Sequence, residues 1–185
     1  VDMHIGSQVT SLEPFEQAYT LLAELVTKLR ARGHDIRHVD LGGGLGIPYR
    51  PEDPEPPRPE AYAAIVKRLF GGMRLKIIAE PGRMIAGNAG ILVTRVIRVK
   101  EGEERTFLIV DAAMNDLIRP TLYEAYHDIW PVREADASAG AQVVDVVGPV
   151  CESGDYLAKR RALPPLAAGD LVALMTAGAY GAVQS

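Results

Sequence analysis

Apolar residues in the first ninety positions follow two alternating patterns. Short continuous apolar runs, typical of buried strands, lie at residues 1–5, 36–41 and 75–79. The segments between them carry apolar residues every three or four positions, the spacing of one buried helix face, at 15–29 and in a segment that ends at Phe70. This order predicts successive βα units, whose strands run parallel.

The start of the first predicted helix carries its own signals. Thr10 and Glu13 have the spacing of a capping box, and Pro14 falls in the first turn, where its missing N–H costs nothing. We therefore expect the helix to begin directly after Thr10.

Each predicted strand ends at or next to a polar residue. These residues are His4, Asp40 and Glu80, and they recur about every 40 residues, the size of one βα unit. Ligands of parallel α/β folds bind at the carboxyl ends of the strands. The sequence therefore predicts a ligand site where these three residues emerge.

The second half of the chain has a different pattern. Segments typical of strands lie at 91–99, 106–111, 142–147 and 171–176, and the first two form a predicted hairpin. Residues 117–129 look helical or irregular, with an interruption at Pro120, and 134–141 form a loop of small residues. We expect two domains, 1–89 with βα units and a β-rich domain at 90–185.

Composition narrows the function classes. A hydrophobic content of 48% with 24% charged residues describes a globular chain, and a net charge of −4 gives no electrostatic reason to bind nucleic acid or an anionic membrane. The single cysteine cannot form an intramolecular disulfide, and no metal-type spacing of Cys and His occurs, so we expect a cytoplasmic protein without a metal. Because the chain starts at Val1, we expect it to be a piece of a longer protein.

Two motifs follow predicted strands. Gly42-Gly43-Gly44-Leu45-Gly46 offers amides that could converge on a phosphate, and a tight strand-exit turn is the alternative. Glu80-Pro81-Gly82-Arg83 places a carboxylate at the end of a buried strand. Glu80 and Arg83 either pair with each other or meet a cationic ring nitrogen and a ligand anion.

Further candidate residues have plain structural alternatives. His4 is either a core histidine or a ring that lies on a cofactor plane. Arg119 and Tyr123 are spaced i, i+4, so one helical turn would point both the same way, as a carboxylate clamp or as surface residues.

Two more candidates lie close to glycines. Cys151, next to Glu152, is either an inert buried thiol or an exposed proton donor. Tyr180 lies in a glycine-rich stretch that fits an ordinary turn or a close approach to a ligand.

Five motifs, in order along the whole chain, carry a family resemblance. They are His4-Ile-Gly-Ser-Gln8, Asp40-Leu-Gly-Gly-Gly-Leu-Gly46, Glu80-Pro-Gly-Arg83, Cys151-Glu-Ser-Gly-Asp155 and Ala179-Tyr-Gly181. Together they resemble the diaminopimelate decarboxylases, fold-type III enzymes that use pyridoxal 5'-phosphate to convert meso-2,6-diaminopimelate to L-lysine and CO2. The resemblance implies an alanine-racemase-type (β/α)8 barrel, of which only the last βα units are present, followed by an incomplete all-β domain. It also implies a homodimer with a shared active site.

The resemblance further implies a role for each motif residue. Pyridoxal phosphate would be bound by His4, Gly43, Gly44, Glu80, Pro81, Gly82, Arg83 and Tyr180. The substrate would be bound by Arg83, Arg119, Tyr123, Glu152 and Tyr180. The catalytic residues would be His4, stacked on the cofactor ring, Glu80 at the ring nitrogen, and Cys151 as proton donor, with Cys151 and Glu152 serving the partner's cofactor.

One part of the family pattern is absent. A (β/α)8 barrel takes about 250 residues, so we expect several units upstream, together with the lysine that binds the cofactor covalently. Lys28 and Lys67 are predicted on helix surfaces, Lys76 at the wrong end of a strand, and Lys100 and Lys159 in loops.

Two alternatives stay open. One is an ornithine-, arginine- or carboxynorspermidine-type decarboxylase of the same fold, and the other is a non-catalytic barrel relative with a binding or regulatory role. The pair Arg83 and Arg119 favours a substrate with a distal carboxylate.

Overall fold

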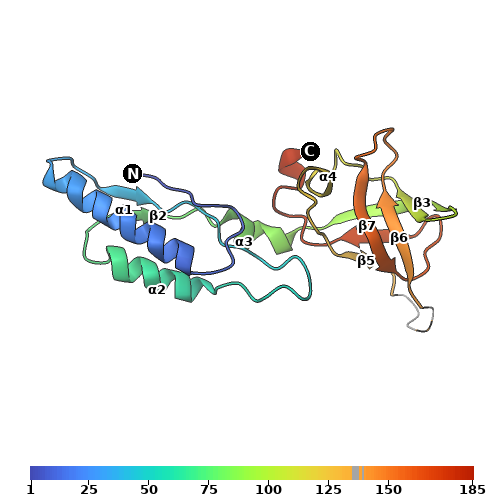
Figure 1. The fold of residues 1–185 in the computed structure, drawn as a ribbon, viewed down its shortest axis with the longest axis horizontal. Coiled ribbons are helices and arrows are strands. Elements are labelled where there is room, and N and C mark those ends of the chain that lie inside the picture. Colours follow the sequence, from blue (N-terminus) through green and yellow to red (C-terminus); the bar gives the residue numbers. More distant parts are fainter. Residues whose placement is uncertain (135–137, 139) are drawn as a thin grey trace. The chain divides into compact units, whose positions relative to one another are not determined.

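The computed structural model describes residues 1–134, 138 and 140–185. These residues form two compact units, one made of Val1–Pro48 and Glu52–Ile85 and the other of Tyr49–Pro51 and Ala86–Ser185. Part of the loop predicted at 134–141, namely residues 135–137 and 139, lies outside the described residues. Figure 1 shows the long helices in the first unit and most of the strands in the second.

The first unit is built from two parallel strands and two long helices. Helix α1 (Glu13–Ala31) leads to strand β1 (His38–Asp40), and helix α2 (Pro59–Phe70) leads to strand β2 (Lys76–Ile78). The two strands pair in parallel, as the βα pattern predicts. The strand predicted at 1–5 is reduced to one parallel bridge, between Asp2 and Asp40, on the other side of β1.

The core of the first unit lies between the helices and one face of the strands (Figure 1). Phe15, Tyr19 and Val26 of α1 are fully buried, and Val39 of β1 packs in the same cluster. Burial of one such apolar side chain contributes about 1.5–3 kcal/mol. The Tyr19 hydroxyl donates to the carbonyl of Leu41 over 3.1 Å, so α1 is fastened to the chain just beyond β1.

Two expectations for the first unit are wrong. Helix α1 begins at Glu13 with Leu12 as N-cap and no side-chain cap, so Thr10 lies before the capping position and forms no capping box with Glu13. The Glu13 carboxylate accepts a hydrogen bond from Gln17 instead. Strand β2 is not buried on both faces. Ile77 packs toward the helical core, whereas Ile78 on the opposite face is 38% exposed.

The second unit contains a six-stranded sheet in the order β5-β8-β3-β4-β6-β7. The strands are β3 (Leu92–Glu101), β4 (Thr106–Val110), β5 (Ile129–Pro131), β6 (Gln142–Val147), β7 (Tyr156–Leu163) and β8 (Leu171–Leu174). All neighbours are antiparallel except β4 and β6. The predicted hairpin is confirmed as β3 and β4, with an irregular register between Val96 and Arg98.

The remaining helices among the described residues are short. They are α3 (Gly82–Ala86), the 3-10 helix η1 (Gly87–Ala89), α4 (Arg119–Tyr123) and the 3-10 helix η3 (Ala182–Gln184). Pro120 lies in the first turn of α4, where a proline fits, so it begins this helix rather than interrupting it.

Strands β5 and β7 were not expected from the sequence. In β7 the run Lys159-Arg160-Arg161 removes the alternation of polar and apolar positions, and the register with β6 shifts twice beside it. Lys159 therefore lies in a strand and not in a loop, and Lys100 likewise belongs to β3. The strand predicted at 171–176 ends at Leu174, because Thr176 has a left-handed backbone with φ 57°.

The sheet encloses the second hydrophobic core. Its fully buried members include Val110, Leu117, Val146 and Leu174, which come from three strands and the segment before α4. In the part of the chain that the structure describes, no helix is both long enough and apolar enough to cross a membrane.

Candidate active site

The ends of the strands in the first unit bring His4, Gly43 and Glu80 together. The amide of Gly43 donates to Nδ1 of His4 over 3.3 Å, and the amide of Glu80 donates to the carbonyl of Gly42 over 2.8 Å. His4 and Glu80 are both exposed. An imidazole, a glycine turn and a carboxylate therefore share one accessible edge of this unit.

The glycines at this edge allow neighbouring backbone segments to pack closely against each other. A Cβ atom on Gly43 would collide with the carbonyl oxygen of Glu80, and one on Gly44, whose φ is +99°, would collide with that of Gly6. The tight-turn interpretation thus explains why glycine stands here. Phosphate binding is also compatible with this turn, because Gly44 is half-buried and its amide makes no hydrogen bond within the described residues.

Glu80 and Arg83 differ in exposure and do not pair. Arg83 is 9% exposed, and its Nε donates to the carbonyl of Ser7 over 2.7 Å. The Glu80 side chain has no ion pair within the described residues. The expectation of a carboxylate on a buried strand is wrong for this chain, because the strand face beside Ile78 is open. A Cβ atom added at Gly82 would meet no other atom within 4 Å.

The two residues predicted on α4 lie in different surroundings. Arg119 is 7% exposed, and one of its terminal nitrogens lies 2.9 Å from Nε2 of His127. Its guanidinium also lies over the ring of Tyr49, with Cζ 4.6 Å from the ring centroid. Tyr123, one turn later, is 59% exposed. The helix thus presents a firmly held cation and an exposed aromatic ring.

Cys151 and Glu152 lie in an exposed turn that follows β6. The buried carboxylate of Asp155 organises this turn, since it accepts hydrogen bonds of 2.7 Å from the amides of Met114 and Val150. The hydroxyl of Thr121 in α4 donates to the carbonyl of Gly154. The turn is therefore tied both to the segment before α4 and to α4 itself.

Tyr180 has a left-handed backbone, with φ 58°. Such a conformation is uncommon for a non-glycine residue, costs about 1–3 kcal/mol, and concentrates at functional sites. The segment before it is anchored by hydrogen bonds from the amides of Ala177 and Gly178 to the carbonyls of Gly90 and Gly87. The turn that presents Tyr180 is held in place by the connection that leads into β3.

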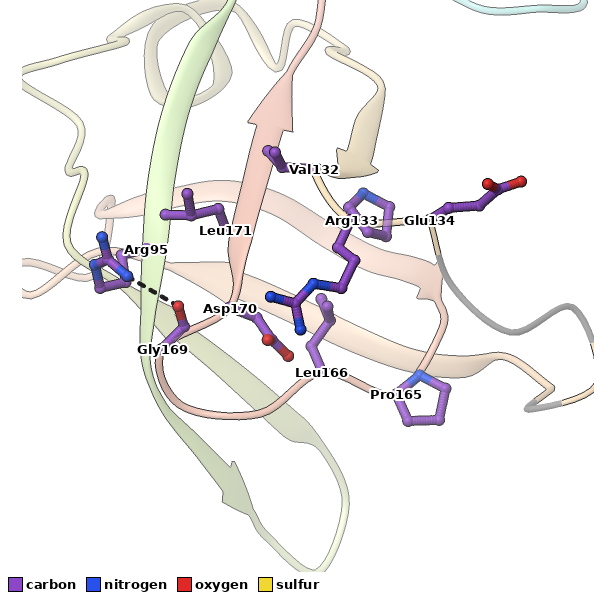
Figure 2. A pocket seen from close by; sticks show the side chains of 10 residues that line it. Arg95, Val132, Arg133, Glu134, Pro165, Leu166, Gly169, Asp170 and Leu171 are labelled. Atoms are coloured by element: carbon purple, nitrogen blue, oxygen red, sulfur yellow. Dashed lines mark hydrogen bonds between the residues drawn. The ribbon is translucent and has the colours of Figure 1, made fainter.

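The hollows of the two units differ in character. One hollow of about 660 Å³ lies between the end of β5 and the loop before β8, and Figure 2 shows Arg95, Arg133, Glu134 and Asp170 around it. A hollow of about 310 Å³ reaches the turn at Glu152 and Ser153. In the first unit, a small apolar hollow of about 130 Å³ is lined by Gly43, Tyr62 and Pro81.

Three residues beside the candidate site were missed in the sequence. Asp155 was visible as the last residue of the Cys151 motif, but a lone aspartate gives no sign that its carboxylate binds two amides. Tyr49 lies far from Arg119 in sequence. His127 lies in the same predicted segment, 117–129, but that segment was expected to be helical or irregular, so no pattern in it indicated a contact between the two side chains.

Comparison with known proteins identifies the family. The model of the C-terminal sheet domain of pyridoxal-dependent decarboxylases matches residues 8–178. The chain belongs to this family. The sheet of the second unit agrees with that description, and the expectation of a pyridoxal cofactor is confirmed for the family.

Individual relatives sharpen the similarity. The chain is 52% identical over 185 residues to a diaminopimelate decarboxylase of Pseudomonas aeruginosa, covering 100% of the chain and 43% of the relative. It is 50% identical over 182 residues to one of Zymomonas mobilis, covering 98% and 42%. The crystal structure of the Helicobacter pylori diaminopimelate decarboxylase complexed with L-lysine aligns with TM-score 0.91 at 41% identity, covering 100% of the chain and 45% of that structure.

These matches confirm the resemblance that the five motifs carry. The chain spans less than half the length of the curated relatives it matches, so the similarity concerns only part of those proteins.

Proposed function

We propose that this chain forms the C-terminal part of a pyridoxal-phosphate-dependent decarboxylase that converts meso-2,6-diaminopimelate to L-lysine and CO2. The observation that carries the proposal is the meeting of His4, Gly43 and Glu80 at one accessible edge. On this proposal residues 1–89 are the last βα units of an alanine-racemase-type (β/α)8 barrel, and residues 90–185 belong to the β-rich domain that follows it.

The residues at this edge fit the cofactor. The amide of Gly44 and the open space at Gly82 suit a phosphate held between Gly43-Gly44 and Pro81-Gly82-Arg83. The exposed His4 ring suits stacking on the pyridine ring, and the exposed Glu80 carboxylate suits the ring nitrogen. When bound, pyridoxal phosphate supplies an electron sink for the carbanion left by departing CO2. Glu80 contributes by keeping the ring nitrogen protonated.

The remaining residues would handle the substrate. Arg83, Arg119 and Tyr123 bind its distal carboxylate, where the guanidinium fork favours bidentate recognition, and Glu152 binds the distal ammonium. The exposed Cys151 thiol donates the proton to the α-carbon, and Tyr180 contacts both cofactor and substrate. We place Cys151 and Glu152 at the partner's cofactor in a homodimer with a shared active site.

The proposal is tested with the full-length protein, assayed for CO2 release from meso-diaminopimelate and from ornithine. We expect kcat/KM to favour diaminopimelate, because an amine-ended substrate leaves the arginines without an anion. A preference for ornithine would replace the proposal by the alternative decarboxylase, and turnover of neither would favour a non-catalytic role.

A substitution separates the role of the thiol from a structural role. Cys151→Ala should lower kcat while the protein keeps its pyridoxal absorbance, because the thiol lies in an exposed turn. Loss of the cofactor from this variant would show that Cys151 is structural instead.

A further inference from the structure

His127 is a buried histidine whose two ring nitrogens both have partners. It is 0% exposed. Its Nε2 lies 2.9 Å from a terminal nitrogen of Arg119, and its Nδ1 lies 2.9 Å from the carbonyl oxygen of Met175. The ring thus connects α4 with the chain just beyond β8.

The chemistry of the partners determines the tautomer. A guanidinium can only donate, so Nε2 of His127 must accept and carries no proton. A carbonyl oxygen can only accept, so Nδ1 must carry the proton. His127 is therefore the neutral Nδ1-protonated tautomer, and it orients Arg119 through a charge-assisted hydrogen bond.

The ring of Tyr49 contacts both Arg119 and His127. Its ring lies under the Arg119 guanidinium and meets the His127 ring edge-on, with 5.7 Å between ring centroids and an interplanar angle of 86°. A cation over an aromatic face is attracted by the ring quadrupole. The Arg119 guanidinium is thus held by Nε2 of His127 and by the face of the Tyr49 ring, and these two contacts leave the side chain little rotational freedom.

We propose that His127 is a positioning residue that sets Arg119 for the distal carboxylate of the substrate, and that it does so through Nε2. The inference rests on the proposed function, since it assigns Arg119 to that carboxylate. His127 itself touches neither substrate nor cofactor. The hydrogen bond from His127 to the Met175 carbonyl links Arg119 to the segment that leads to Tyr180. His127 therefore supports both Arg119 and the segment before Tyr180, and Arg119 and Tyr180 are two of the residues that we propose contact the substrate.

Two matched variants of the full-length protein test the inference. In His127→Gln the amide oxygen can take the place of Nε2 and still accept from Arg119. In His127→Asn the shorter amide can take the place of Nδ1 and still donate to Met175, but Arg119 loses the acceptor that Nε2 of His127 provides. Both variants remove the ring, so a purely structural role predicts similar damage in each.

We expect His127→Asn to raise KM for meso-diaminopimelate on the order of 10- to 100-fold, the range of one hydrogen bond to a charged group. The kcat should change far less, since the carboxylate is bound equally before and during reaction. His127→Gln should stay within about threefold of the unsubstituted protein, a change small beside one such bond. Equal KM values in the two variants, or a higher value in the Gln variant, would overturn the proposal.

Arg119→Met provides the control that separates this inference from the proposed function. If it raises KM as much as His127→Asn does, and the double variant is no worse than Arg119→Met alone, His127 acts through Arg119. If Arg119→Met leaves KM unchanged, the assignment of Arg119 to the carboxylate fails, and the proposal about His127 fails with it. If Arg119→Met raises KM but the two effects add, the proposed function stands and the positioning role is wrong.

Discussion

The carboxylate of Asp155 provides the sharpest test of how the Cys151 turn is built. It is 4% exposed and accepts hydrogen bonds from two amides, those of Met114 and Val150, each over 2.7 Å. A hydrogen bond to a charged group contributes about 1.5–3 kcal/mol. In Asp155→Asn the side-chain NH2 group must face the amide of Met114 or that of Val150. The hydrogen bond to that amide is lost, because two N–H donors then face each other. We expect the local structure to lose about 2–4 kcal/mol.

Amide hydrogen exchange in the full-length protein measures this loss where it occurs. If the turn opens locally, 2–4 kcal/mol corresponds to about 30- to 1000-fold faster exchange. The peptides that contain Met114 and Val150 should show it. Asp35→Asn is the matched control, because that carboxylate is exposed and forms an ion pair with the exposed Arg37, and exchange should change little. Exchange within about twofold of the unsubstituted protein at Met114 and Val150 would refute this account of the turn.

Three further changes have defined outcomes. Gly43→Ala should lower the pyridoxal phosphate content of the purified full-length protein, because the added Cβ collides with the Glu80 carbonyl oxygen. Gly72→Ala is the control and should leave this content unchanged, since a Cβ there meets no other atom. Equal cofactor contents in the two variants would contradict this. Tyr19→Phe should cost about 1–2 kcal/mol in urea unfolding, because it removes the hydrogen bonds that the hydroxyl makes with the buried Leu41 carbonyl and with the Tyr62 hydroxyl. Burial raises the pKa of Tyr19 above its ordinary value of 10.0, so the folded protein binds this proton more tightly than the unfolded chain does. The free energy of unfolding should therefore fall above about pH 10, where the unfolded chain loses the proton first. Tyr19→Phe should make this fall smaller. The chain 1–185 produced alone should yield no borohydride-trapped cofactor, because none of its lysines is predicted to be the one that binds it; a trapped lysine found by mass spectrometry would contradict this.

Local patterns predicted those parts of the fold in which one face of an element is buried. Phe15, Tyr19 and Val26 recur at helical spacing and form the buried face of α1, and β6 has the bounds that its apolar run indicates. Strand β7 was missed because Arg160 has a left-handed backbone, with φ 51°, within a basic run, and its pairing with β6 is irregular. Long-range pairing stabilises such a strand, and its own sequence gives little sign of it.

The candidate site shows the same division. His4, Gly43 and Glu80 could be predicted together because parallel strands end on one side, which depends only on topology. The surroundings of Arg119 could not be predicted, because His127 and Tyr49 reach it through the tertiary structure. The strand before Glu80 was expected to be buried, and one of its faces is open in this chain, which spans less than half the length of the relatives it matches.

The central claim is that His4, Gly43 and Glu80 contact one flat phosphorylated cofactor. A crystal structure of the full-length protein with pyridoxal phosphate tests it most directly. The account predicts the phosphate against the amides of Gly43 and Gly44, the His4 ring on the face of the pyridine ring, and the Glu80 carboxylate at the ring nitrogen. Density for the cofactor away from these residues, or a ring nitrogen that faces a different side chain, would contradict it.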